Sequence, residues 1–323
     1  DVQRQQKIDS VVIDKSWYGL QFSSDDRFLY VSGGHNNQIV KYELKNGKLA
    51  LVDSIVLGKP WPERIGPAGI AIDDKRQQLY VVTRENKQLY VIDLKTKQII
   101  RQLGLEAEGY ACKISRDFSE LFVSCWGCDH VLVLDLNQYN WKTPVPVGDN
   151  PNEMLLTPDG KFLYVCNAND NSVSVIDVRK KRVIETLDAA LYPNSPSGST
   201  TNSLALDAAH KKLYIANADG NCLAVFDVRQ PGNSLSLGFI PTGWYPTCVR
   251  LVNNKLWVAN GKGFGSKANP SGPSPLRKKE EVIHHGGISK QGSEVQYIGS
   301  LLKGSMSVIA PPSAKELTAY SAQ

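Results

Sequence analysis

Apolar and polar residues recur along the chain with a period of 42–50 residues. Each unit opens with a short apolar strand, continues through a polar turn and then carries a second strand with an aromatic residue at its centre. Counted along the printed numbering, these aromatic positions step by 50, 42, 42, 50 and 43 residues, which is typical of a four-stranded propeller blade. The second strands are Leu29-Tyr30-Val31, Leu79-Tyr80-Val81, Leu121-Phe122-Val123, Leu163-Tyr164-Val165, Leu213-Tyr214-Ile215 and Leu256-Trp257-Val258.

Two further strands complete most units. Within the strands the alternation has a period of two, and the inner strands are nearly all apolar because neighbouring blades cover both of their faces. The pattern therefore predicts an all-β protein, a β-propeller of four-stranded antiparallel blades. The predicted third strands are residues 39–44, 89–94, 131–136, 173–178 and 223–228, and the clearest fourth strands are 98–103 and 182–187.

Fragments at both ends of the chain bear on the number of blades. Residues 7–13 are predicted to be the last strand of an earlier blade, and 305–311 and 316–320 to be the third and fourth strands of the sixth repeat. We therefore expect seven blades in the intact protein, the first of them incomplete in this chain, with a six-bladed ring as the alternative. Residues 1–323 are interpreted as a single propeller domain with a long inserted loop at 261–304.

Composition and motifs exclude several classes of chemistry. The net charge of +5 is mild and its basic residues are scattered, and no apolar run approaches the length of a membrane span. We found no nucleophile elbow, phosphate-binding loop or zinc-protease motif, so no catalytic residue, metal site or cofactor is expected. Cys125 and Cys128 have CxxC spacing, for which a disulfide and a pair of free thiols both remain open, whereas zinc would need two further ligands.

Propeller topology places the long connections, residues 57–67, 188–201 and 261–304, on one face. Long loops on a rigid scaffold are where function concentrates. Aromatic and basic residues around a central channel suit a polar or anionic ligand, or a partner domain. The candidate binding residues on this face are Trp17, Tyr18, Trp61, Arg64, Arg84, Tyr110, Trp126, Trp244, Tyr245 and Lys262.

The repeats resemble the YVTN family of β-propellers, also called YncE-like. Leu163–Asp177 meets the family pattern closely. Gly238–Gly263, Asn269–Pro273 and Tyr297–Gly304 resemble a subgroup in which the propeller precedes an alkaline-phosphatase-like phosphoesterase domain. The resemblance implies that the metal ligands and the nucleophile lie in that downstream domain, which we expect to be absent from this chain. It also implies a bacterial, exported protein in the periplasm or on the outer surface.

We therefore expect a non-catalytic binding or scaffold domain that docks its own phosphoesterase domain or another protein, or binds a small polar or anionic ligand on the long-loop face. The full-length protein would then be a phosphoesterase through its C-terminal domain. The first alternative is a propeller enzyme, lactonase-like or quinoprotein-like, that uses the central channel. The second is single-stranded nucleic-acid binding, which the modest net charge disfavours.

Overall fold

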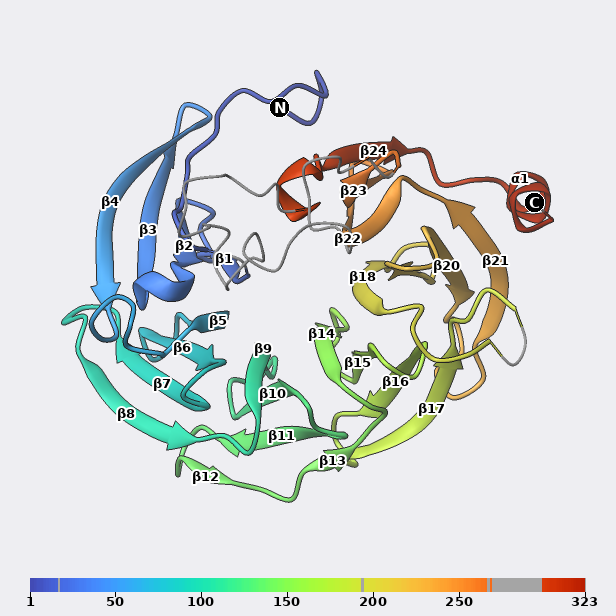
Figure 1. The fold of residues 1–323 in the computed structure, drawn as a ribbon. Helices are drawn as coiled ribbons and strands as arrows, with labels where there is room; N and C mark the ends of the chain where they lie inside the picture. Colours follow the sequence, from blue (N-terminus) through green and yellow to red (C-terminus); the bar gives the residue numbers. More distant parts are fainter. Residues whose placement is uncertain (17, 193–194, 266–267, 269–297, 323) are drawn as a thin grey trace, which may run out of the picture.

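Six antiparallel sheets surround a central axis in this computed structural model, which describes residues 1–16, 18–192, 195–265, 268 and 298–322 (Figure 1). The strands of each sheet follow one another in sequence from the innermost to the outermost, as in a propeller blade. Four sheets have four strands, the third has two short strands sharing its outer position, and the sixth has three.

The strands begin and end as follows. The first sheet is β1 (Leu20–Phe22), β2 (Phe28–Ser32), β3 (Gln38–Lys45) and β4 (Lys48–Val56), and the second is β5 (Pro67–Asp73), β6 (Gln78–Thr83), β7 (Gln88–Asp93) and β8 (Ile99–Gly104). The third is β9 (Glu108–Ile114), β10 (Glu120–Trp126), β11 (His130–Asp135), β12 (Asn140–Trp141) and β13 (Val145–Pro146), and the fourth is β14 (Pro151–Leu156), β15 (Phe162–Asn167), β16 (Ser172–Asp177) and β17 (Arg182–Asp188). The fifth is β18 (Thr201–Asp207), β19 (Lys212–Asn217), β20 (Cys222–Asp227) and β21 (Leu235–Pro241), and the sixth is β22 (Trp244–Val252), β23 (Lys255–Gly263) and β24 (Ser305–Ile309).

The aromatic repeat of the sequence corresponds to the second strand of every sheet. Tyr80 and Phe122, for example, are completely buried. Within the described residues, five hydrophobic clusters each fill the space between two successive sheets, and the repeat aromatic residues of the first five sheets lie in them. The repeat is therefore the sequence signature of the cores between blades, and the four-stranded fold that it predicts is confirmed.

Both predictions for the chain ends were wrong in part. Residues 7–13 form no strand; Asp9 accepts a hydrogen bond of 2.8 Å from the Leu49 amide, and Val11 and Ile13 pack on the first sheet. Residues 316–320 belong to a helix, α1 (Ala314–Ser321), rather than to a fourth strand. Ser313 and Glu316 form a capping box, which satisfies the first amides of a helix and so favours it over a strand.

The ring of described residues is open at one place. Each inner strand packs on the inner strand of the next sheet from β1 round to β22, whereas β22 and β1 make no comparable contact (Figure 1). Leu20 and Phe22 on β1 are 67% and 40% exposed. The six sheets match the six-bladed alternative, and the sixth of them has three strands. Residues 7–13, assigned to an incomplete first blade, form no strand.

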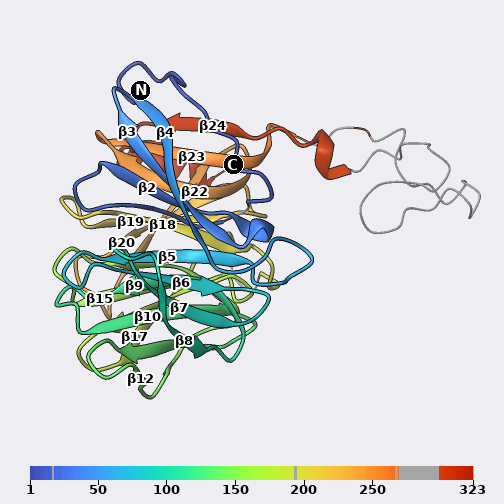
Figure 2. The ribbon, with the colours of Figure 1, turned by 90° about the vertical axis from the view of Figure 1, so that its left-hand side faces the viewer.

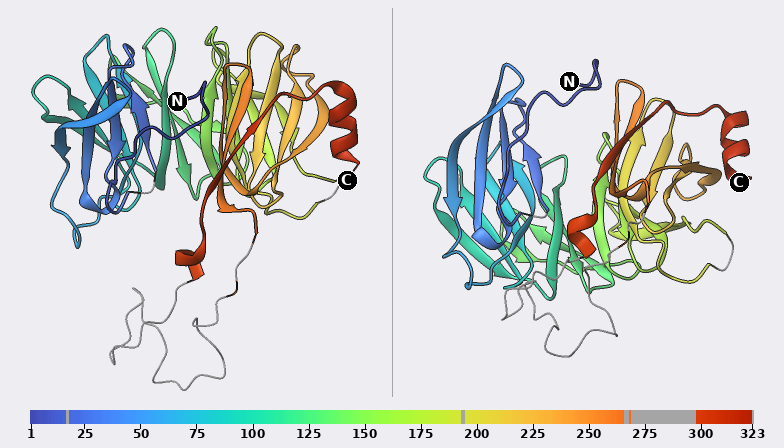
Figure 3. Two further views of the ribbon diagram at one scale, coloured as in Figure 1. Left: turned by 90° about the horizontal axis from the view of Figure 1, so that it is seen from above. Right: turned by 45° about the horizontal axis from the view of Figure 1, so that its top comes forward.

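The long connections lie on one face of the ring, as predicted. The described parts of the insertion after β23, the segment between β4 and β5 and the segment between β17 and β18 all extend from the same side (Figure 3). Figure 2 shows the short helix η3 (Ile298–Leu301) standing away from the sheets on this side. We call this side the long-loop face.

Gly19 limits the packing of the first two inner strands. A Cβ atom there would lie 1.9 Å from the Ala68 carbonyl oxygen and 2.6 Å from Ser32 Oγ, and the φ of +102° disfavours any side chain. We expect Gly19→Ala to lower the free energy of unfolding by about 2–4 kcal/mol, measured by urea denaturation. Gly104→Ala is the matched control, since nothing lies within 4 Å of its Cβ position. Equal midpoints for the two variants would contradict this assignment.

Candidate functional site

Bulges at the start of the inner strands shape the mouth of the central channel. In β9 and β18 one residue of the inner strand, Tyr110 and Asn202 respectively, has no partner on the second strand, and in β22 two residues, Tyr245 and Thr247, have none. β5 and β14 have a register shift at the same height. Bulges redirect side chains and are frequent beside binding sites, so this repeated irregularity marks the channel mouth on the long-loop face.

An ion pair crosses the channel between β14 and β22. Arg250 Nη2 lies 2.7 Å from Glu153 Oε1, and the Leu204 amide of the intervening β18 donates to Glu153 Oε2 at 3.3 Å. Arg250 Nη1 also donates to Ser203 Oγ at 3.1 Å. Burial lowers the pKa of Arg250, but the charges of Glu153 and Cys248 and the hydrogen bond to Glu153 together outweigh burial, so the net pKa is raised and the cation is retained.

This ion pair lines a cavity of about 490 Å³, a size within the usual range of small-molecule sites. Tyr18, Lys113 and Asn202 also contribute to its wall. Lys113 has no ion-pair partner among the described residues. The wall therefore presents two cationic side chains and one carboxylate, which gives it an excess positive charge.

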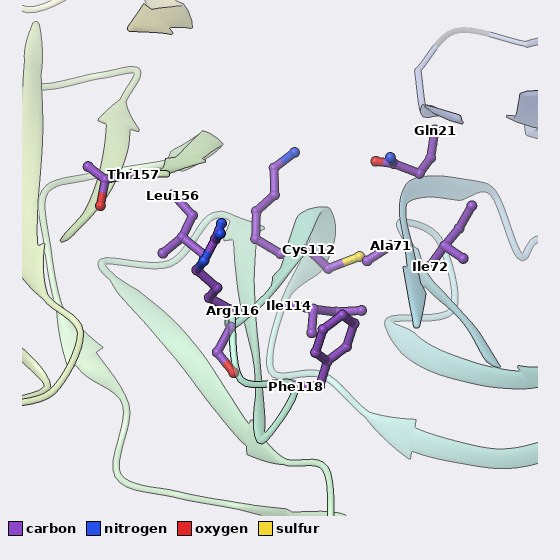
Figure 4. A pocket seen from close by; sticks show the side chains of 11 residues that line it. Gln21, Ala71, Ile72, Cys112, Ile114, Arg116, Phe118, Leu156 and Thr157 are labelled. Atoms are coloured by element: carbon purple, nitrogen blue, oxygen red, sulfur yellow. The ribbon is translucent and has the colours of Figure 1, made fainter. Parts of the chain in front are cut away.

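A second cavity of about 590 Å³ continues the channel toward the opposite face (Figure 4). Both cavities share Gln21, Cys112 and Lys113, so the two spaces adjoin. Figure 4 shows the side chains of Gln21, Cys112 and Arg116 around this lower space. Its walls combine the apolar side chains of Ile72, Ile114, Phe118 and Leu156 with the polar side chains of Ser115 and Thr157.

Aromatic side chains form a row at the mouth. The ring centroids of Tyr18 and Tyr110 are 4.5 Å apart, and Trp126 stacks on Tyr110 at 6.1 Å. Desolvation raises the pKa of both tyrosines, so their hydroxyls stay protonated. Since Tyr18 also lines the upper cavity, the row leads from the long-loop face into the channel.

The other predicted residues form separate groups on the same face. The ring centroids of Trp61 and His35 are 5.6 Å apart, and the Arg64 guanidinium lies 5.0 Å from the Trp61 ring centroid. The Lys262 ammonium lies 4.0 Å from the Tyr245 ring. The remaining candidates are Arg84, paired with Glu108 at 2.8 Å, Trp244, 40% exposed at the start of β22, and Trp17, which lies outside the described residues.

The charged channel residues were missed from the sequence. Lys113, Glu153 and Arg250 stand on innermost strands that are otherwise mostly apolar. The sequence did contain one signal, namely charged residues on strands that were expected to be covered on both faces. Burying a charge costs free energy unless the charge faces a partner or a water-filled space.

Fold and site together define a β-propeller with a polar, positively biased central channel. A family model described as "Lactonase, 7-bladed beta-propeller" matches residues 111–247, which include Glu153. The chain is similar to the uncharacterized protein YncE of Salmonella typhimurium, with 29% identity over 132 residues that cover 39% of this chain and 37% of YncE. It is also similar to antigen Lp49 of Leptospira interrogans, with 26% identity over 111 residues, 32% of this chain and 24% of Lp49.

The similarity to solved structures concerns the fold. The periplasmic gluconolactonase PpgL of Pseudomonas aeruginosa aligns with a TM-score of 0.67 at 18% identity, over 77% of this chain and 79% of PpgL. A putative 6-phosphogluconolactonase of Bacteroides fragilis aligns with a TM-score of 0.62 at 16% identity, over 75% of this chain and 76% of that chain. The chain therefore shares the β-propeller fold of these structures. No helix among the described residues is long and apolar enough to cross a membrane.

Proposed function

We propose that the chain is a binding domain whose central channel accepts a small, polar, anionic ligand from the long-loop face. The supporting observation is the cavity between Arg250, Glu153 and Lys113, in which one cation is paired and the other has no ion-pair partner among the described residues. A ligand carboxylate or phosphate would find a charged donor in Lys113, and the aromatic row would cover its apolar side.

Calorimetric titration with gluconate, 6-phosphogluconate and neutral glucose tests this proposal. We expect both anions to bind more tightly than glucose, and Lys113→Gln to weaken anion binding about tenfold, because a charged hydrogen bond contributes about 1.5–3 kcal/mol before solvent screening. Lys75→Gln is the matched control, since Lys75 is exposed in the turn after β5 on the opposite face. Equal binding of anions and glucose, or an equal loss in both variants, would refute the assignment.

Lactone hydrolysis in the same channel is a second candidate. It is favoured by the approach of a carboxylate and a guanidinium within 2.7 Å and by the family match across Glu153. Arg250 would polarise the lactone carbonyl and Glu153 would accept a proton from the attacking water. The test is hydrolysis of gluconolactone above the spontaneous rate, abolished in Glu153→Gln. Ligand binding without lactone hydrolysis would refute this second candidate and support the first proposal.

The exposed rim of the long-loop face supports a third proposal, the docking of a phosphoesterase domain or another protein. Trp61 and Trp244 are 49% and 40% exposed, and Phe264 is 82% exposed. Large exposed rings are frequent at protein interfaces. In this proposal the protein is exported to the periplasm or the outer surface; PpgL, which has a similar fold, is a periplasmic protein. The test is co-purification with a separately expressed phosphoesterase domain, with and without Trp61→Ala.

A further inference from the structure

A four-residue turn, Cys125-Trp126-Gly127-Cys128, joins β10 to β11 in the third sheet. The Cys128 amide donates to the Cys125 carbonyl at 3.3 Å, and Gly127 has a φ of +88° in the third position. This is the pattern of a β-turn that needs glycine there, and it brings the two Cα atoms within about 7 Å. A disulfide spans Cα separations of about 4.4–6.8 Å, so the turn can hold the two cysteines reduced or bonded.

The two thiols contact each other and differ in their access to solvent. Cys125 is completely buried, and Cys128 is 8% exposed beside the exposed Asp129. The hydrogen bond from the Cys125 thiol lowers the pKa of Cys128; burial opposes this, and the nearby His130 adds to the lowering. The same contact, together with burial, raises the pKa of Cys125. The pair thus loses its first proton more readily than an isolated thiol, and the contacts favour the thiolate on Cys128, the sulfur nearer to solvent.

His130 supports this arrangement from the start of β11. Its Nδ1 lies 2.9 Å from Asp129 Oδ1, and its Nε2 lies 3.0 Å from Glu106 Oε2. Desolvation lowers the pKa of His130. The hydrogen bond to Asp129 and the charges of Cys128 and Glu106 together raise it by more, so the net pKa is raised. An imidazolium beside a thiol favours the thiolate.

The other four cysteines lack this environment. Burial raises the pKa of Cys112 to about 12 and of Cys222 to about 11, and it also raises the pKa of Cys166 and Cys248. Of the six cysteines, all within the described part of the chain, Cys128 alone has a lowered pKa.

We propose that Cys125 and Cys128 form a redox-active dithiol that closes to a disulfide by exchange with a small-molecule disulfide. The Cys128 thiolate attacks one sulfur of the external disulfide and releases the first thiolate. Cys125 then loses its proton and attacks the Cys128 sulfur, which forms the internal bond and releases the second. The protein gives up two electrons and two protons, and the external disulfide takes them up as two thiols.

Hydrogen bonds connect this turn to the channel. The Gly127 amide donates to Asn150 Oδ1 at 2.7 Å, and the Asn150 amide donates to the Cys128 carbonyl at 2.9 Å. Asn150 immediately precedes β14, the strand of Glu153. Trp126, between the two cysteines, stacks on Tyr110 of the aromatic row. The oxidation state of the pair therefore acts on the strand and the ring that line the mouth.

Equilibration of the full chain in glutathione buffers of increasing oxidised fraction tests the proposal. After acid quenching, alkylation and trypsin digestion, one peptide bounded by Arg116 and Lys142 contains both cysteines and no other. We expect this peptide to lose two alkyl groups together and to become two hydrogens lighter, with unchanged alkylation at Cys112 and Cys248. Cys248→Ser should behave like the wild type, and Cys125→Ser should not close.

A second measurement keeps the proposal falsifiable should Cys125→Ser fail to fold. At pH 7 the reduced wild type should react with iodoacetamide at Cys128 at least about fivefold faster than at Cys248, because the larger thiolate fraction outweighs the lower nucleophilicity. The oxidised chain should also differ from the reduced chain in tryptophan fluorescence, and Trp126→Phe should remove the difference. A peptide that stays fully alkylated in oxidised glutathione, or equal rates at Cys128 and Cys248, would overturn the proposal.

Discussion

Phe122→Ala is expected to lower the free energy of unfolding by about 3–5 kcal/mol, one of the two largest effects we predict. Phe122 is completely buried on β10, in the cluster that joins the third and fourth sheets. Its ring packs with residues of β14 and β15, including Met154 and Leu163. Truncation removes its buried apolar area and leaves a cavity that two rigid sheets cannot close.

Phe264→Ala is the matched control for this change, because the Phe264 side chain is 82% exposed on the long-loop face. Its free energy of unfolding should stay within about 0.5 kcal/mol of the wild type. Urea denaturation followed by circular dichroism measures both variants. If Phe122→Ala lowered the free energy of unfolding as little as Phe264→Ala, the contact between the third and fourth sheets would contribute little to stability.

Arg250→Met is expected to have the largest effect on anion binding that we predict, together with a loss of stability. Among the described residues, it leaves the Glu153 carboxylate, which is only 14% exposed, with one hydrogen bond, from the Leu204 amide. We expect a loss of about 1–3 kcal/mol in the free energy of unfolding from the unpaired group. Anion binding measured by calorimetry should fall more than tenfold, because the cavity then keeps one cation opposite one carboxylate.

The combined variant Glu153→Gln/Arg250→Met separates the two contributions. It removes both charges, so it should regain part of the stability lost in Arg250→Met while its anion binding stays weak. Arg229→Met is the matched control, since Arg229 pairs with Asp227 in an exposed turn and its side chain is 71% exposed. A double variant as unstable as Arg250→Met would show that packing, and not charge, is the role of Arg250.

The architecture could be predicted from the sequence because its signal is local and repeated. The aromatic second strands and the aspartates that end the third strands return in unit after unit. Asp93, for example, accepts bonds of 3.0 and 2.7 Å from the amides of Lys95 and Thr96. Each such turn closes within a few residues, so its chemistry is visible in the order of residues.

The channel was harder to predict because it depends on register and on distant pairs. Glu153 and Arg250 are 97 residues apart and meet only when three inner strands are aligned around the axis. The unpaired residues at the bulges of the inner strands, such as Asn202, change which side chains face the channel. No local sequence pattern predicts these bulges. The predicted rim residues Tyr18, Tyr110 and Trp126 do come together, whereas Trp61 and Tyr245 belong to other groups.

The opening between the sixth and first sheets makes the described ring a linear array in energetic terms. Each of the second to fifth sheets shares a core with two neighbours, whereas the first and sixth share one each. In a nearest-neighbour description, an end unit opens at the cost of one interface and an interior unit at the cost of two. Local unfolding should therefore begin at the ends and travel inward. The third and fourth sheets, which hold the thiol turn and Glu153, are the part of the array protected longest.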